Sequence, residues 1–483
     1  MSSKTVAFLA VQVVLIYCAY RAYYKDDTGQ SLTPEEEIIS IWEERIKLPT
    51  RQFKKVAVGL NANVDLIVKG SELLRMLNIS PGHKLDHHEL NSLHELQEVF
   101  AFFLAKGSGA ERNFANGEDF GKMVDAAERL SRADWFIGGN AALMAQKIIT
   151  TFPDTQVQLV GPVGPRLKSL LDQNMQVPQS SRIDKDEVHM ILEFERGEKW
   201  GDHQAPVATR FITSHDLSNA RMDKLETLFA SLGSFQPDLV ILSGLHIMEG
   251  QSEDFLKKRL EDLAGNLRLL PSTVPVHLEL ASMTKPWFMK LIMEIVLPTV
   301  SSLGLNEQEL AFASHATDGP HNTMYKEIKG QPEIHKVSDI MTWLLKTYSY
   351  GSKNYPNSKL TRVHFHSLTY HITGTLNVAW RNERAAVAAG TRIAAKQACD
   401  MKIFDPTKVD IKSPEQFKLF TGDKLRSFNQ SEPVLSWKTG DFKFCFSPVL
   451  VCKHPLKTVG LGDAISATGL LFSEYDAKYA DQS

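Results

Sequence analysis

The feature that most constrains the fold of this 483-residue chain is a repeated alternation between short apolar runs and amphipathic helical patterns. Strand-like runs occur at residues 55–61, 157–160, 239–243, 276–280 and 363–366. Apolar residues at helical spacing occupy residues 34–48, 140–151, 252–263 and 383–399. Strands that are apolar on both faces and separated by helices are typical of a parallel sheet covered on both sides. The sequence therefore predicts an α/β fold with crossover connections and, lacking a repeat of 20–50 residues, excludes a solenoid.

The strand and helix pattern is interrupted by a more helical and charged segment, which predicts a second, smaller domain. Short strand-like runs at residues 187–194 and 211–213 fit the same excursion from the main sheet. We predict a discontinuous lid made of residues 66–137 and 187–213, inserted into a large domain made of residues 31–65, 138–186 and 214–483. Two stretches rich in Gly, Ser, Asn and Pro, residues 314–332 and 346–359, are predicted to be long surface loops.

The first 30 residues differ from the rest of the chain. Residues 6–20 are apolar apart from Gln12, and charge returns between Arg21 and Asp27. As a helix this run would span roughly 22 Å, short of the roughly 30 Å hydrocarbon core of a bilayer. It predicts a signal peptide or N-terminal anchor, hence the endoplasmic reticulum or secretory pathway and membrane attachment through this segment alone. Whether it is cleaved stays open, because no clear small-residue cleavage site follows.

Composition excludes several classes of protein. Forty-three per cent hydrophobic residues exclude a disordered or collagen-like chain. A net charge of -3 without a long basic run argues against a nucleic-acid-binding protein. The four cysteines form no CxxC metal motif, although Cys399 and Cys452 could pair in an oxidising lumen. Two N-x-S sequons, at Asn78 and Asn429, are compatible with that compartment.

The strongest local motif is TVGLGD, residues 458–463, followed by a helical apolar pattern. Gly460 and Gly462 allow a tight turn, and a Gly-rich turn that opens a helix presents unpaired N–H groups to a phosphate. Asp463 could cap this helix or act as a base beside a transferring group. The sequence contains neither a GxxxxGK[ST] phosphate loop nor a GxSxG nucleophile elbow, which argues against a P-loop enzyme and an α/β-hydrolase.

Further polar residues follow the predicted strands. NANVD, residues 61–65, ends the first strand, where open α/β sheets place ligand-binding residues, although an Asn/Asp turn explains it equally well. In GGN, residues 138–140, Asn140 could be a helix N-cap. Glu279 and Glu309 also follow strand-like runs and could reach Mg²⁺ directly or through water. His364, His366 and His371 do not favour zinc, because no third ligand has a matching spacing.

Taken together, NANVD, GGNAA, HLELAS, GLNEQE, RVHFH and TVGLGD resemble the ADP-dependent glucokinases of the animal type, within the ribokinase-like superfamily. The resemblance extends from about Pro34 to Tyr475. It implies a three-layer αβα large domain, a smaller discontinuous α+β lid and a monomer.

The resemblance also implies a role for each matching residue. Asp463 matches the base that takes the proton of the sugar 6-hydroxyl, and Gly460, Leu461 and Gly462 match the anion hole. Arg210 matches an arginine that steadies the nucleotide phosphate. The expected sugar contacts are Asn63, Asp65, Glu111, Gly139, Asn140 and His189, with Glu111 favouring glucose over fructose 6-phosphate. The expected nucleotide contacts are Asn306, His366, Ser367 and, through its backbone, Cys452. The expected metal-associated acids are Glu279, Glu309 and Asp463.

The activity implied is ADP + D-glucose → AMP + D-glucose 6-phosphate, with Mg²⁺ as cofactor and glucose and ADP as the small-molecule partners. Two alternatives stay open at this point. One is a kinase of the same fold that uses ATP or another sugar or nucleoside. The other is a non-catalytic lumenal protein that binds sugar or nucleotide, which the intact Asp463 and Gly460–Gly462 turn argue against.

Overall fold

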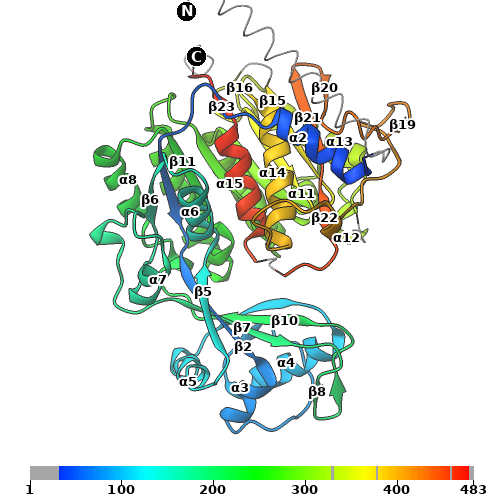
Figure 1. Cartoon of the computed structure of the whole chain (residues 1–483). Coiled ribbons are helices and arrows are strands. Elements are labelled where there is room, and N and C mark those ends of the chain that lie inside the picture. The colour runs from blue at the N-terminus through cyan, green and yellow to red at the C-terminus, as the bar shows by residue number, and fades with distance from the viewer. Residues whose placement is uncertain (1–31, 328–330, 377–378, 457–458, 478–483) are drawn as a thin grey trace, which may run out of the picture.

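The computed structural model describes residues 32–327, 331–376, 379–456 and 459–477, and these form a large and a small lobe (Figure 1). The hydrophobic segment predicted at residues 1–30 lies outside the described residues. Each lobe is built on its own sheet, nine-stranded in the large lobe and six-stranded in the small one. None of the helices in the described ranges has the length and apolar character needed to cross a membrane.

The nine-stranded sheet has the order β20-β21-β15-β14-β13-β12-β11-β1-β6. The strands from β6 to β14 are parallel, and β15, β21 and β20 continue the sheet in antiparallel fashion. The bounds are β1 (Lys55–Leu60), β6 (Gln156–Val160), β11 (Leu239–Ser243), β12 (Val276–Glu279), β13 (Ser302–Asn306), β14 (Arg362–His366), β15 (Tyr370–Leu376), β20 (Leu435–Thr439) and β21 (Phe442–Pro448).

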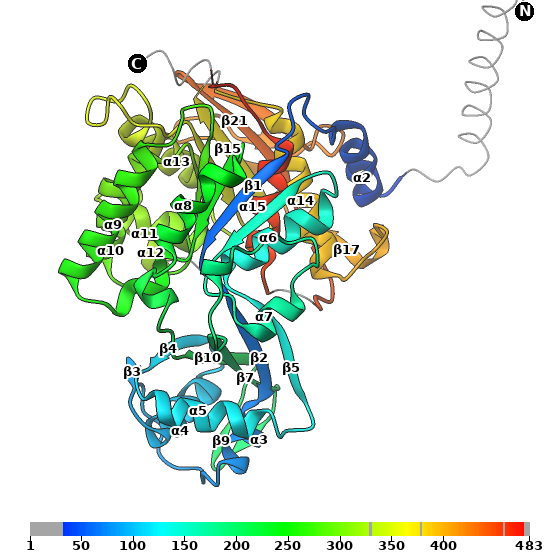
Figure 2. The ribbon, with the colours of Figure 1, turned by 90° about the vertical axis from the view of Figure 1, so that its left-hand side faces the viewer.

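Helices cover both faces of this sheet, as the two views at right angles show (Figures 1 and 2). One face carries α2 (Pro34–Arg45), α6 (Asn140–Thr151), α14 (Glu383–Ala398) and α15 (Leu461–Phe472). The other carries α8 (Leu225–Phe235), α9 (Glu253–Arg268), α10 (Pro286–Leu291) with the π-helical turn η4 (Ile292–Val296), α11 (Glu307–Ala316) and α13 (Ile334–Tyr348). Strands such as β11 and β12 are buried along their whole length because both faces are covered. This three-layer αβα architecture confirms the predicted fold class.

The small lobe is a sheet with the order β3-β4-β10-β7-β2-β5, packed against three helices. Its strands are β2 (Asn63–Lys69), β3 (Glu89–Leu90), β4 (Ala110–Phe114), β5 (Ala133–Gly138), β7 (Val188–Phe194) and β10 (Thr209–Ser214), and its helices are α3 (Gly70–Met76), α4 (Leu93–Lys106) and α5 (Gly117–Ala127). The predicted lid boundary at residue 66 falls inside β2, because the chain leaves the large sheet at Leu60 and enters the small one at Asn63. The lid therefore includes Asn63 and Asp65, which the prediction assigned to the large domain.

Shorter elements complete the fold. Two-stranded pairs are formed by β8 (Lys199–Trp200) with β9 (His203–Gln204), β16 (Trp380–Arg381) with β23 (Glu474–Tyr475), β17 (Val409–Ile411) with β22 (Leu450–Cys452), and β18 (Gln416–Phe417) with β19 (Arg426–Ser427). The remaining helical turns are α7 (Pro165–Leu170), α12 (Met324–Glu327), η1 (Gln179–Ser181), η2 (Asn219–Arg221), η3 (Leu245–Gly250), η5 (Leu297–Thr299) and η6 (Pro406–Lys408). The stretch predicted as a surface loop at 314–332 thus contains the end of α11 and all of α12, because the apolar side chain of Met324 is buried there.

Helix α2 shows how local sequence and tertiary packing combine. Thr33 and Glu36 form a capping box, with the Glu36 N–H donating to Thr33 Oγ1 and the Thr33 N–H donating to Glu36 Oε2. Pro34 occupies the first helical turn, where no backbone N–H is needed. Trp42 is fully buried, and its indole N–H donates to Ser447 at the end of β21. The cap starts the helix, and Trp42 fixes it on the large lobe.

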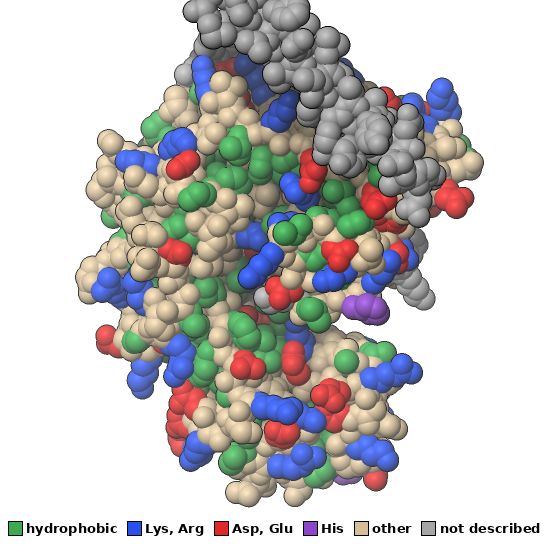
Figure 3. Space-filling model, in the orientation of Figure 1, with side chains coloured by type: hydrophobic (Ala, Val, Ile, Leu, Met, Phe, Trp, Pro, Cys, Tyr) green, Lys and Arg blue, Asp and Glu red, His purple; other side chains and the backbone are tan. Residues whose placement is uncertain are grey.

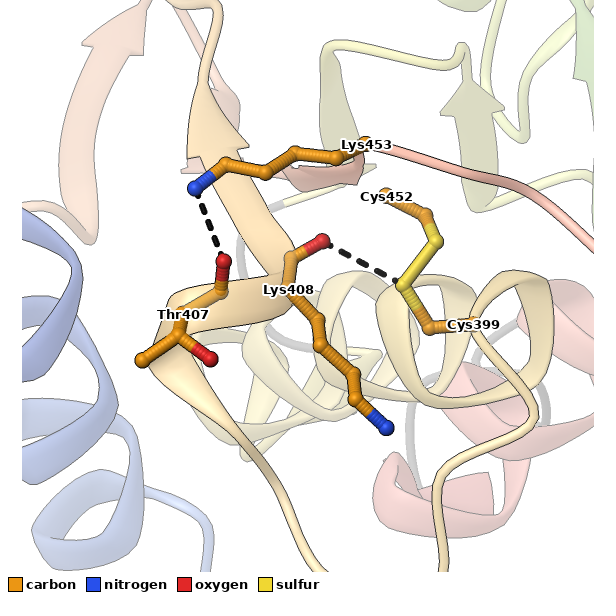
Figure 4. The surroundings of a disulfide bond; sticks show 5 residues. All are labelled: Cys399, Thr407, Lys408, Cys452 and Lys453. Atoms are coloured by element: carbon orange, nitrogen blue, oxygen red, sulfur yellow. Dashed lines mark hydrogen bonds between the residues drawn. A yellow bond between two sulfur atoms is a disulfide. The ribbon is translucent and has the colours of Figure 1, made fainter.

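A disulfide links Cys399, which caps the end of α14, to Cys452 in β22 (Figure 4). The two Cα atoms are 5.5 Å apart and both side chains are buried. Beside it, Lys453 Nζ donates to the Thr407 carbonyl and holds the strand end against η6 (Figure 4). The bond closes a loop of 53 residues in sequence separation, so it restricts the unfolded chain substantially.

We expect Cys399→Ser to lower the free energy of unfolding by about 2–4 kcal/mol, because the unfolded chain regains the entropy of an open loop. Urea unfolding with and without dithiothreitol measures this. The reductant should destabilise the parent chain by a similar amount and leave Cys399→Ser unchanged. A parent chain that does not respond to reductant while its thiols are shown to be free would contradict the prediction.

Candidate active site

A cavity of about 170 Å³ lies between the two lobes. Its walls come from β2, β4, β7 and β10 of the small lobe and from the starts of α6 and α15 and the turn η3 of the large lobe. Figure 3 shows the surface indented at the junction of the lobes. The volume is below the roughly 300–1,000 Å³ of pockets for drug-sized ligands, so it suits one small polar molecule.

Helix α15 begins at the wall of this cavity. Gly460, its N-cap, has a φ of 65°, a left-handed conformation that disfavours side chains with a Cβ. The turn directs the first amides of the helix, those of Leu461 and Gly462, away from any intrahelical acceptor. Unpaired N–H groups and the positive end of a helix dipole together bind anions. The start of α15 therefore has the geometry of an anion-binding helix N-terminus at one end of the cavity.

Asp463 lines the cavity in the first turn of α15, and the N-cap position of that helix is occupied by Gly460 rather than by Asp463. Its Oδ1 accepts a hydrogen bond of 3.0 Å from Asn140 Nδ2. Burial raises the pKa of Asp463 to about 7, the negative charge of Glu279 adds to this rise, and the bond from Asn140 opposes it. A carboxylate with such a pKa can exchange a proton near neutral pH, which a general base requires.

The predicted sugar contacts Asn63, Asp65 and Asn140 also line the cavity. Burial raises the pKa of Asp65 to about 6, while the charge of His189 and a 2.9 Å hydrogen bond from Asn63 Nδ2 oppose the rise. Asn140 is the first residue of α6, and Gly139 occupies the cap position, so the expectation that Asn140 is the N-cap is wrong. Its side chain is directed instead toward Asp463, because Asn61 holds the start of the helix through the Ala141 N–H.

His189, Glu111 and Arg210 complete the small-lobe wall. Registry across the small sheet sets His189 beside Asp65 on β2 and beside Ser214 on β10. His189 Nδ1 lies 3.8 Å from Glu111 Oε1, and burial raises the pKa of Glu111. Arg210 carries a positive charge near enough to Asp65 to lower its pKa. Acidic and basic side chains thus both line the cavity.

The other predicted residues lie behind the cavity, at the ends of neighbouring strands. Glu279 at the end of β12 accepts hydrogen bonds from His277, His366 and Ser466 at 2.9–3.0 Å. Burial alone would raise the pKa of Glu279, but the two histidines lower it to about 2. The carboxylate is therefore ionised, and its charge acts on Asp463.

Glu309 and Asn306 form a reciprocal capping box at the start of α11. The Asn306 N–H donates to Glu309 Oε2 at 2.8 Å, and its Nδ2 donates to Oε1 at 2.9 Å. Burial raises the pKa of Glu309 to about 7 in spite of these bonds. Asn306 pairs in register with His366 of β14, so the predicted nucleotide and acidic residues are neighbours along one sheet edge.

The side chains of two predicted nucleotide contacts, Ser367 and Cys452, are bonded to other parts of the protein. The Ser367 hydroxyl donates to the Tyr370 carbonyl at 2.9 Å within the turn between β14 and β15. The Cys452 side chain is in the disulfide, which leaves its backbone as the part available to a ligand. Neither lines the cavity between the lobes.

The surroundings of these acids decide how they could hold Mg²⁺. Within the described residues, no group of three or more His, Cys, Asp or Glu side chains is arranged to hold a metal ion. Glu279 and Glu309 already use their oxygens in hydrogen bonds. The negative charge of Glu279 nevertheless raises the pKa of both Asp463 and Glu309. Mg²⁺ keeps several waters and binds mainly through substrate phosphates, so these acids fit a hydrated ion rather than direct ligation.

Sequence reasoning missed several residues of the site. Asn61 and His246 line the cavity, and each follows a strand, β1 and β11, in the position where ligand residues were sought. Asn61 lies within the NANVD motif, of which the sequence predicts only Asn63 and Asp65 as contacts. The apolar part of the cavity wall, which no polar motif could have indicated, consists of Leu143, Ile191, Ile212, Ile247 and Val459.

Comparison with known proteins agrees with this geometry. Residues 54–472 match the ADP-specific Phosphofructokinase/Glucokinase conserved region. The chain belongs to the ADP-specific phosphofructokinase/glucokinase family. It is 47% identical over 446 residues to an ADP-dependent glucokinase of Bos taurus, covering 92% of this chain and 89% of that protein. It is 41% identical over 462 residues to a probable ADP-dependent glucokinase of Caenorhabditis elegans, covering 94% and 92%.

Solved structures support the fold of this family member. A crystal structure of a hypothetical ADP-dependent phosphofructokinase from Pyrococcus horikoshii OT3 superimposes with a TM-score of 0.66 at 20% identity, covering 88% of this chain and 98% of that one. An ADP-dependent kinase in complex with fructose 6-phosphate and ADPβS gives a TM-score of 0.65 at 19% identity, covering 92% and 98%. At such identities the likeness concerns the fold alone.

We expect Gly304→Ala in β13 to lower the free energy of unfolding by about 1–3 kcal/mol, because overpacking forces buried groups to shift. A Cβ at this position would lie 1.8 Å from Glu279 Oε2, and three hydrogen bonds prevent that carboxylate from moving aside. Urea unfolding measures the effect. The matched control is Gly265→Ala in α9, where a Cβ meets nothing within 4 Å. This variant should have a free energy of unfolding about 0.5–1 kcal/mol higher than the parent chain, because Ala favours a helix over Gly. Equal stability of the two variants would contradict the prediction.

Proposed function

We propose that this chain is an ADP-dependent glucokinase, which transfers the β-phosphate of ADP to the 6-hydroxyl of D-glucose and releases AMP and D-glucose 6-phosphate. One observation carries the proposal. Asp463 and the start of α15 line the same cavity as the polar side chains of the small lobe, and that cavity has room for one small polar molecule. The extensive identity to the glucokinases of Bos taurus and Caenorhabditis elegans supports the same donor and acceptor.

The reaction needs positioning and charge neutralisation more than covalent chemistry. Asp463 accepts the proton of the attacking hydroxyl, and the Asn140 side chain orients its carboxylate. The N–H groups of Leu461 and Gly462 receive the charge of the transferring phosphate, and Arg210 adds a positive charge from the other lobe. Closure of the lobes excludes water, which would otherwise take the phosphate in place of the sugar.

Mg²⁺ is proposed as the cofactor. When bound, it neutralises charge on the phosphates of the nucleotide. Glu279, Glu309 and Asp463 would hold it through its waters, because the mutual repulsion of these acids favours a cation between them.

The charges at the cavity support glucose over a phosphorylated sugar. Asp65 and Glu111 place two carboxyl groups at the wall, and their oxygens suit the hydroxyl groups of a neutral sugar. If the acceptor were a sugar that already carried a phosphate group, both carboxylates would repel that phosphate. Glu111 is half exposed within the cleft, so a substrate can reach it.

We also propose that the protein works in the oxidising lumen of the secretory pathway. The Cys399–Cys452 disulfide supports this, because such bonds persist in oxidising compartments and are rare where glutathione keeps thiols reduced. Fractionation of cells that produce the full chain, with protease protection of the lumenal material, tests the compartment.

The decisive test follows AMP and glucose 6-phosphate from ADP, glucose and Mg²⁺, with ATP in a parallel reaction. We expect equal amounts of the two products from ADP, and a loss of about 10²–10⁴-fold in Asp463→Asn, which retains the shape but not the base. The control is Asp254→Asn, an exposed acid in the first turn of α9, which should keep the parental rate. Turnover with ATP alone would overturn the donor, and no turnover by folded protein would favour a binding protein.

The pH dependence of kcat/KM gives a second prediction. Since the pKa of Asp463 is raised to about 7 and a base acts in its ionised form, kcat/KM should fall by about tenfold per unit well below pH 7. The residual activity of Asp463→Asn should lack this acid limb. An unchanged acid limb in that variant would assign the ionisation to another group.

A further inference from the structure

An ion pair beside the cavity has no part in the roles described so far. His189 Nε2 lies 2.9 Å from Asp216 Oδ2, and the side chains are 12% and 5% exposed. His189 lines the cavity, whereas Asp216 lies behind it, two residues after the end of β10. Asp216 was not among the residues that the sequence motifs indicated.

Asp216 is itself held in place by the segments that join the lobes. Asn219 Nδ2 lies 3.3 Å from Asp216 Oδ1, and the same side chain bonds both the N–H and the carbonyl of Ala62. Glu187 accepts hydrogen bonds from the backbone N–H groups of residues 217–219. The carboxylate of Asp216 is therefore fixed relative to the chain that connects β1 to β2.

Charged groups face His189 from every side. Asp216 lies behind it, Asp65 and Glu111 come from β2 and β4, and His246 comes from η3 of the large lobe. Arg210 of β10 acts on the neighbouring Asp65. Glu187 faces Asp216, and burial together with the charge of Asp216 raises the pKa of Glu187 to about 7. Burial alone would lower the pKa of His189, but the carboxylates of Asp216, Glu111 and Asp65 together raise it to about 10. Burial would likewise raise the pKa of Asp216, but His189 and its hydrogen bonds lower it to about 2.

We propose that Asp216 is a positioning residue for the acceptor sugar: it binds Nε2–H of His189, keeps the imidazole cationic and directs its Nδ1–H toward the cavity, where it donates to an oxygen of the substrate. The identity of that substrate rests on the proposed function. The position of Nδ1, 3.8 Å from Glu111 Oε1, sets this donor beside the carboxyl groups that would accept from the sugar hydroxyls. A neutral imidazole keeps only one N–H, so without Asp216 the proton is no longer fixed on Nδ1, and the carboxyl groups of Asp65 and Glu111 lose a compensating charge.

The experiment uses the full chain and the variant Asp216→Asn, which retains the shape of the side chain and removes its charge. Steady-state kinetics are measured with ADP, glucose and Mg²⁺ from pH 6 to pH 9. We expect the glucose KM at pH 8 to rise at least about tenfold, with kcat and the ADP KM changed less than about threefold. The glucose KM of the variant should also rise with pH through the ordinary histidine range, near pH 6.5, whereas the parent stays flat between pH 7 and 8.5.

A double-mutant cycle separates positioning from general structure. His189→Gln alone should raise the glucose KM, and adding Asp216→Asn to it should change the KM by less than about twofold. The matched control is Asp223→Asn, an acid beside the same turn whose side chain is half exposed, which should keep the parental KM. Thermal unfolding checks that each variant is folded, and Asp216→Ser replaces Asp216→Asn if the latter does not fold.

The outcomes distinguish this inference from the proposed function. The role of Asp216 would be overturned if Asp216→Asn had the same glucose KM as the parent at pH 8. It would also be overturned if the effects of Asp216→Asn and His189→Gln on the glucose KM were additive in the double-mutant cycle. A parent chain that does not phosphorylate glucose with ADP would overturn the proposed function instead. In that case the ring signal of His189 in NMR, assigned by its loss in His189→Gln, still tests the ion pair. It should titrate at least two pH units lower in Asp216→Asn than in the parent, and an unchanged titration would overturn the pairing.

Discussion

Burial of negative charge at the junction of the lobes is the constraint on which the rest of the site depends. Asp463 and Asp65 face the cavity, and the more deeply buried Glu279 lies behind Asp463. Burying an ionised carboxylate is costly unless donors or cations compensate it. Compensation is uneven here: histidines hold Glu279 ionised, while Asp463 and Asp65 are left with pKa values near 7 and 6. Glu279 therefore keeps its negative charge, whereas Asp463 and Asp65 can gain and lose a proton near neutral pH.

The same constraint explains how the two lobes are joined. Chain segments cross between the sheets near residues 60–63, 138–140, 183–188 and 214–219. Asn219 bonds the backbone of the first crossing, and Glu187 in the third binds the backbone of the fourth. Polar side chains thus fasten the crossings, and their positions set the ends of the strands that carry Asp65 and His189. A movement of one lobe against the other would be transmitted to the small-lobe wall of the cavity through these bonds.

A large part of the architecture followed from the sequence because its signals are local. The runs at residues 239–243 and 140–151 coincide with β11 and α6, since a buried strand and an amphipathic helix each have their own periodicity. Turn and strand-end motifs identified Asp463 and Asp65 for the same reason. Asp216 carried no such signal, because its partner His189 is 27 residues away in sequence and is brought near only by the antiparallel pairing of β7 and β10.

The sequence by itself determined the alternation of strands and helices, the fold class and the presence of a helix after the TVGLGD turn, all of which depend on neighbours within one or two turns of chain. It could not decide whether Cys399 pairs with Cys452, whether Asn140 caps a helix or orients Asp463, or which carboxyl groups stay ionised. Those outcomes depend on atoms from distant segments and on how much water the packed lobes exclude. Only the tertiary structure fixes both, because the free energy of a buried charge is set by its surroundings rather than by its place in the chain.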